Sequence, residues 1–60
     1  MIDMQASLEK LRADAAEAAL IRDLVTDIDK RELFDRLSTH LTMLANEVER
    51  AIEMRLANEK

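Results

Sequence analysis

Two runs of apolar residues recur at helical spacing in this sequence, but the two runs are out of phase with each other. The first run steps by three or four residues through Leu8, Leu11, Ala15, Ala18, Ile21, Val25 and Ile28. The second run passes in the same way through Phe34, Leu37, Leu41, Leu44, Val48 and Ala51. Steps of three and four place residues on one side of an α-helix, so each run predicts an amphipathic helix.

A single straight helix through both runs would bury charged side chains. At about 100° per residue, the second run begins roughly half a turn away from the first. Extending the spacing of the first run would place Arg22, Asp29, Glu32 and Arg36 among the apolar positions. We therefore expect the chain to reverse and to form an all-α fold. The predicted structure is a two-helix antiparallel hairpin with helices at about residues 4–27 and 30–57, in a single domain of residues 1–60.

The reversal is expected at Asp29, where the sequence has the form of a capping box. The Asp29 carboxylate would accept from the backbone N–H of Glu32, and Glu32 would reach back to that of Asp29. Ile28 and Leu33 occupy the positions of a hydrophobic staple around this cap. Helices commonly end with a left-handed residue, usually glycine. The chain contains no glycine, and Asp27 or Asp29 is expected to adopt that conformation at modest cost.

The expected core also predicts self-association. The core and association positions are Leu8, Leu11, Ala15, Ala18, Ile21, Val25, Phe34, Leu37, Leu41, Leu44, Val48 and Ile52. A hairpin that pairs along these positions would leave apolar residues exposed on its flanks, namely Leu20, Leu24, Leu33, Ala45, Ile52 and Met54. Two hairpins packed face to face would cover them as a homodimeric four-helix bundle. A different protein partner would satisfy the same physics.

Composition narrows the classes of function. The 60 residues include no cysteine, and the formal net charge is −4, which disfavours binding to nucleic-acid phosphates or anionic lipids. The longest apolar run, "AALI", is far too short to span a membrane. The N-terminal residues lack the basic and apolar regions of a secretory signal. The expected location is therefore the cytoplasm.

The sequence predicts no catalytic, metal or cofactor site. His40 has no acidic or imidazole neighbour three or four residues away, as a metal ligand or general base on a helix would require. Ser38 and His40 would point about 200° apart on one helix, too far for a nucleophile and its base. Two roles stay open for His40: a polar residue flanking the core, or a pH-sensitive contact at a dimer interface.

Two resemblances extend this interpretation. In length, acidity, helical composition without cysteine and expected dimeric bundle, the chain resembles the Rop-type plasmid copy-number regulators, which bind paired RNA loops along one face of their bundle. The predicted first helix offers Lys10, Arg12 and Arg22 among acidic residues and no aromatic, a poor platform for RNA.

A second resemblance is to small uncharacterised bacterial helical-hairpin proteins. It covers Leu11-Arg12, Ala15, Glu17-Ala18, Arg31 to Phe34, Arg36-Leu37, Leu41, Leu44-Ala45, Glu47 and Glu49. This resemblance implies a fold and no activity. From the sequence we expect a noncatalytic protein–protein interaction module, such as a small regulator or adaptor, that acts as a self-associated bundle. The alternative is a Rop-like RNA-binding regulator.

Overall fold

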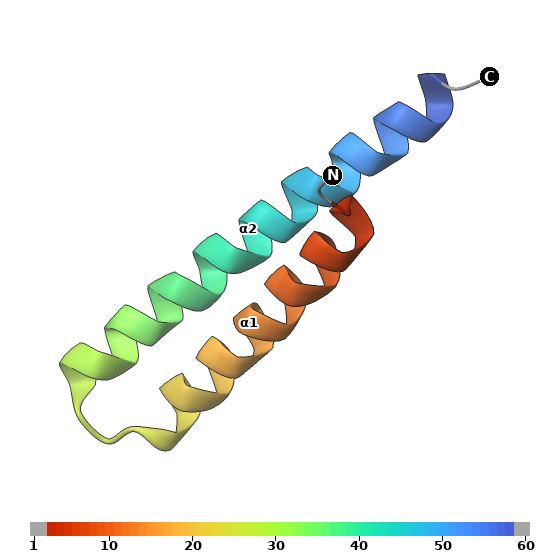
Figure 1. Cartoon of the computed structure of the whole chain (residues 1–60). Coiled ribbons are helices and arrows are strands. Elements are labelled where there is room, and N and C mark those ends of the chain that lie inside the picture. The colour runs from red at the N-terminus through yellow and green to blue at the C-terminus, as the bar shows by residue number, and fades with distance from the viewer. Residues whose placement is uncertain (1–2, 59–60) are drawn as a thin grey trace.

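The computed structural model describes residues 3–58 and contains two long α-helices. Helix α1 spans Met4–Leu24 and helix α2 spans Ile28–Asn58. They pack side by side in opposite directions, joined by a short connection at one end (Figure 1). The molecule measures 51 × 16 × 15 Å. The prediction of an all-α, two-helix hairpin is confirmed.

Helix α1 begins where the sequence predicts and ends earlier. The Asp3 side chain caps its N-terminus by accepting from the backbone N–H groups of Gln5 and Ala6, at 3.0 and 3.3 Å. The predicted end at residue 27 is wrong, because α1 stops at Leu24 and Val25 is extended, with φ −84° and ψ 145°. No residue of the described part of the chain has a positive φ. The expected left-handed Asp27 or Asp29 is therefore also wrong, and an extended Val25 ends the helix without requiring glycine.

The cap of α2 is Asp27, so the predicted capping box of Asp29 and Glu32 is wrong. The Asp27 carboxylate accepts from the backbone N–H of Asp29 at 2.9 Å, and its carbonyl oxygen accepts from the N–H of Arg31 at 3.0 Å. Asp29 consequently lies inside the first turn of α2, which begins at Ile28 instead of residue 30. An earlier cap lets the chain cross between the helices in three residues, 25–27, while Val25 stays half-buried.

The helices meet along a line of small and medium-sized side chains, which we call the seam. On α2 the seam consists of Phe34, Ser38, Leu41, Ala45, Val48 and Ile52. On α1 it consists of Met4, Leu8, Leu11, Ala15, Ala18, Arg22 and Val25. Within residues 3–58 the buried residues are only Ala15, Ala18, Ser38 and Ala45, and Ala45 is 0% exposed. The backbones therefore approach most closely over small residues in the middle of the hairpin.

Two of the predicted core and association positions on α2 do not face α1. Leu37 and Leu44 are exposed in the hairpin, and the neighbouring Ser38 and Ala45 face α1 in their place. Both sets step by three and four residues, so helical spacing fits either. The structure selects the set with smaller side chains opposite Ala15 and Ala18, because large residues on both helices would hold the backbones apart.

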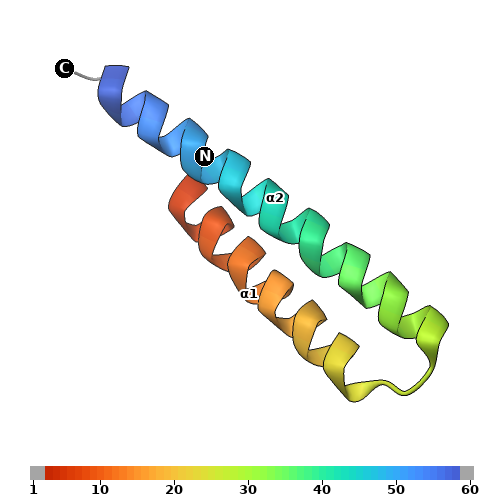
Figure 2. The same cartoon turned by 180° about the vertical axis from the view of Figure 1, so that it is seen from behind.

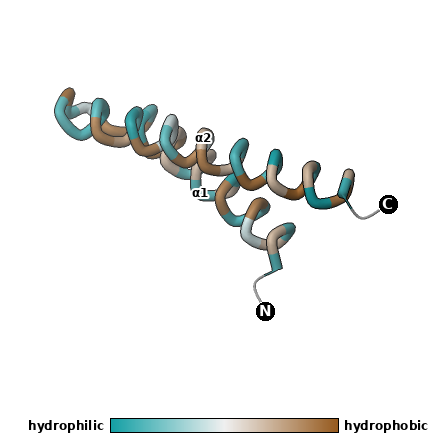
Figure 3. Tube along the Cα trace, turned by 90° about the horizontal axis from the view of Figure 1, so that it is seen from above, coloured by the Kyte–Doolittle hydropathy of each residue, from teal (hydrophilic) through white to brown (hydrophobic). Residues whose placement is uncertain are grey.

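Helix α2 is longer than α1 and continues beyond it. Its last turns extend past the N-terminus of α1, as both broad views show (Figures 1 and 2). Seen from above, the two helices overlap over part of their length, and the N-terminal part of α1 points away from the axis of α2 (Figure 3).

The position of the α2 cap leads to a stability prediction. We expect Asp27→Ala to lower the free energy of unfolding by about 1 kcal/mol, because it removes the acceptor for an N-terminal backbone N–H. Asp29→Ala serves as the control, since its carboxylate caps nothing, and should cost less than half as much. Chemical unfolding followed by circular dichroism measures both. If Asp29→Ala lowers the free energy of unfolding more than Asp27→Ala does, the capping box predicted from the sequence is supported instead.

The close approach at Ala45 leads to a second prediction. Ala45→Leu should destabilise the hairpin by about 1–3 kcal/mol, because the added side chain has no space between the helices. Asn46→Leu introduces the same side chain at the adjacent exposed position and should change stability by about 0.5 kcal/mol or less. Equal effects of the two substitutions in a chemical unfolding experiment would show that the seam lies elsewhere.

Candidate protein-interaction face

Ion pairs between the helices lie along one side of the seam. Arg12 Nη2 lies 3.0 Å from Glu49 Oε2, and Arg22 Nη1 lies 2.9 Å from Asp35 Oδ1. Arg22 Nε also contacts Asp23 Oδ1 at 3.1 Å. The hydrogen bonds to Asp23 and then to Asp35 raise the pKa of Arg22 above its ordinary value. The two carboxylates therefore favour the charged form of Arg22, and we call this side the ion-pair face.

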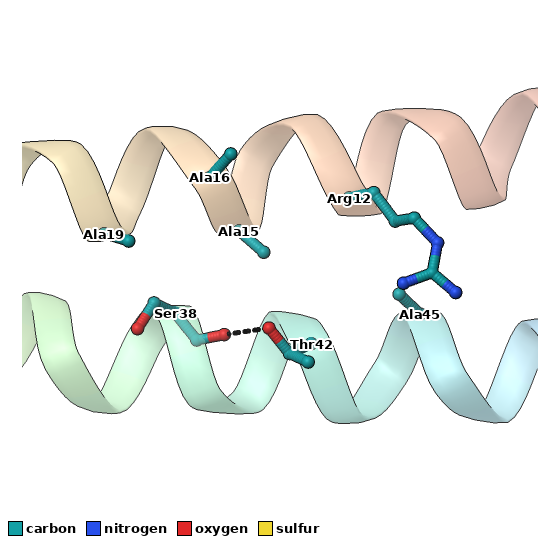
Figure 4. Close-up of a pocket in the computed structure, with 7 residues that line it drawn as sticks. All are labelled: Arg12, Ala15, Ala16, Ala19, Ser38, Thr42 and Ala45. Atoms are coloured by element: carbon teal, nitrogen blue, oxygen red, sulfur yellow. Dashed lines mark hydrogen bonds between the residues drawn. The ribbon is translucent and has the colours of Figure 1, made fainter.

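A depression of about 300 Å³ opens on the ion-pair face, lined by Arg12, Ala15, Ala16, Ala19, Ser38, Thr42 and Ala45 (Figure 4). Its two hydroxyl groups are used within α2. Ser38 Oγ donates to the carbonyl of Asp35, and Thr42 Oγ1 donates to the carbonyl of Ser38, each at 2.8 Å. Among residues 3–58, no buried side-chain nitrogen or oxygen lacks a hydrogen-bond partner. The depression exists because the side chains that line it are mostly small. The hydroxyl groups in it already donate hydrogen bonds within α2 and do not point to a ligand.

The opposite side of the seam carries exposed leucines. Each of three leucines on α2 comes directly before a seam residue: Leu33 before Phe34, Leu37 before Ser38, and Leu44 before Ala45. The ion-paired acids Asp35 and Glu49 each come directly after a seam residue instead. A shift of one residue is about 100° around a helix. The leucines and the ion-paired acids of α2 therefore lie on opposite sides of the seam.

On helix α1, too, the ion-paired and leucine residues lie on opposite sides of the seam. Arg12 comes directly after the seam residue Leu11 and pairs with Glu49, so the residues that follow the seam on both helices share the ion-pair face. Leu24 comes directly before Val25, and Leu20 lies one turn earlier, at the outer edge of the same side, because it is two residues away from both Ala18 and Arg22 of the seam. These two leucines therefore lie on the side that carries the exposed leucines of α2. We call Leu20, Leu24, Leu33, Leu37 and Leu44 the leucine face.

The leucine face is well exposed and concentrated toward the connection. Leu24 is 72% exposed and Leu20 59%, while Leu37, the most covered of the five, is still 39% exposed. Toward the chain ends the residues that precede the α1 seam change to Lys10, Asp14 and Glu17. A soluble monomer rarely presents a contiguous cluster of large apolar side chains unless the cluster binds something.

Most of the predicted core residues lie at or near the seam. Ala15 and Ala18 are buried, and the half-buried positions are Leu8, Leu11, Ile21, Val25, Phe34, Leu41, Val48 and Ile52. The remaining two, Leu37 and Leu44, belong to the leucine face. The sequence analysis missed Ser38 and Ala45 in the core. Of the predicted flanking residues, Leu20, Leu24, Leu33 and Met54 are exposed as expected, whereas Ala45 is buried and Ile52 half-buried.

Other kinds of site find no support in the described residues. Within residues 3–58, no group of three or more histidine, cysteine or acidic side chains is arranged to hold a metal ion. Neither helix in that range combines the length and the apolar character that crossing a membrane demands. The absence of enzymatic activity stays a prediction.

Comparison with protein-family models, with curated protein sequences and with solved structures found no match to this chain. The resemblances to Rop-type regulators and to small bacterial hairpin proteins therefore stay predictions. The candidate site consequently depends on the geometry and exposure of the leucine face.

Proposed function

We propose that this protein is a noncatalytic protein–protein interaction module that acts as a self-associated helical bundle, in the manner of a small regulator or adaptor. The observation that carries the proposal is the leucine face. Five leucines are exposed on one side of the hairpin, while the opposite side is closed by ion pairs between the helices. Covering the leucines requires a second polypeptide.

The exposed area supports a partner of ordinary size. The hairpin exposes 4949 Å², whereas a compact monomer of 6.9 kDa is expected to expose about 4,000 Å². The excess is about 950 Å², close to the roughly 800 Å² that each partner contributes to a standard protein–protein interface. The radius of gyration, 14.4 Å, likewise exceeds the value of about 10 Å expected for a globular chain of this length.

The angle between the two contact lines favours a four-helix bundle. Helix α2 contacts α1 along the seam and carries the leucines one residue earlier, about 100° around its axis. In a four-helix bundle each helix packs against two neighbours that lie roughly at right angles around it. A second hairpin on the leucine face would supply the missing neighbour.

The RNA-binding alternative has less support. The basic residues of α1 are all engaged with acids: Lys10 with Asp14 at 3.3 Å, Arg12 with Glu49, and Arg22 with Asp23 and Asp35. Pairing with carboxylates reduces the positive potential that attracts phosphates. We therefore do not propose it as a second function.

Self-association through the leucine face makes the melting temperature depend on protein concentration. We expect Leu37→Lys to shift the sedimentation-equilibrium mass from dimer toward monomer, because a charge would be buried without a partner. Ile28→Lys is the matched control, since Ile28 is 66% exposed and lies off the leucine face, and it should leave the dimer intact. A wild-type chain that sediments as a folded monomer at all accessible concentrations contradicts the proposal.

A further inference from the structure

Leu33, Leu37, His40 and Leu44 of α2 each come directly before a seam residue, and their positions are symmetrical about the point midway between Leu37 and His40. Glu47 continues this line at one end, three residues after Leu44, and Lys30 continues it at the other, three residues before Leu33. We call these six residues the α2 stripe. The spacings along the stripe are three, four, three, four and three residues. Read from either end the spacing is the same, so the stripe matches a second copy of itself that runs in the opposite direction.

We propose that two copies of the hairpin pack with their α2 stripes antiparallel, about a twofold axis that passes between Leu37 and His40. This inference rests on the proposed self-association and specifies its geometry. It places Lys30 opposite Glu47 of the second copy at both ends of the contact. Inside these ends, Leu33 lies opposite Leu44, and Leu37 lies opposite His40. The connections of the two hairpins then lie at opposite ends of the bundle.

Charge selects this direction over the parallel one. Antiparallel pairing brings a lysine and a glutamate together at each end of the stripe, whereas a parallel, in-register pair would set Lys30 against Lys30 and Glu47 against Glu47. Neither residue takes part in an ion pair between the residues that the structure describes. Opposite charges at the edge of an interface direct which surfaces meet, and like charges disfavour the wrong arrangement.

The surface of α2 is already shaped for this contact. A depression of about 310 Å³ lies on the stripe and is lined by His40, Met43, Leu44 and Glu47. Residues spaced by three, four and seven form the hole that accepts one side chain from a facing helix in coiled-coil packing. Antiparallel pairing of the stripes places Leu33 of the second copy over this hole. The twofold axis repeats the same insertion on the other side.

Cysteine cross-linking tests the direction without ambiguity, because the chain has no native cysteine. We would prepare Lys30→Cys and Glu47→Cys as separate proteins, mix them, and treat them with a short bis-maleimide. The proposal expects covalent dimers in the mixture and none in either protein alone, since positions 30 and 47 are about 25 Å apart along one helix. Arg50→Cys mixed with Lys30→Cys is the control and should not cross-link, because position 50 lies about 200° around α2 from the seam residue Val48.

Each other outcome overturns the proposal. Cross-linking of Lys30→Cys with itself would show a parallel contact. No cross-link in the mixture, with a dimer in sedimentation equilibrium, would show another packing of two hairpins and leave the proposed function standing. No cross-link together with a monomer would overturn both the geometry and the proposed function.

Charge reversal provides an independent test of the same geometry. Lys30→Glu should weaken the dimer about tenfold, because two attractive pairs become repulsive. Adding Glu47→Lys in the same chain should restore the affinity, and Arg50→Glu, which makes the same change on the outer side of α2, should have little effect. The differences should shrink at high salt. A double variant as weak as the single one contradicts the Lys30–Glu47 pairing.

Discussion

The close approach of the two helices over small side chains is the constraint on which the rest of the structure depends. Ala15, Ala18, Ser38 and Ala45 form the buried part of the seam. None of these side chains is large, so hydrophobic burial within one hairpin is modest. Their value lies in letting two backbones come near enough for the larger residues between them to interdigitate. A leucine at position 45 would separate the helices and lose contacts along the whole line.

This arrangement displaces Leu37 and Leu44 of α2 to one side. With Ser38 and Ala45 turned inward, Leu37 and Leu44 must lie about 100° away, beside the leucines of α1 and not between the helices. Helix α2 thus uses one side to contact α1 and another side to offer a surface to a partner. The small-residue line holds the fold together, and the leucine line is available for a partner. Ion pairs on the remaining side keep that side polar and make it a poor competitor for the same partner.

Hydrophobic spacing predicted the number of helices and their antiparallel direction. It did not predict which of two equivalent lines on α2 faces α1. Leu37 and Leu44 are more hydrophobic than Ser38 and Ala45, so a rule based on hydrophobicity selects the leucines, whereas side-chain volume across the interface selects the small residues. The turn was misplaced for a related reason. Asp27 and Asp29 are both suitable caps, and only the half-buried position of Val25 distinguishes them.

The connection between the helices has a consequence for how the topology is encoded. No described residue of the connection has a positive φ, so its backbone does not require glycine. Thr26 is exposed and needs no special backbone conformation, so substitutions can accumulate there without changing the path of the chain. The reversal is determined instead by the many apolar positions along both helices. We therefore expect the hairpin to survive a single substitution in the connection, because the other positions still favour it.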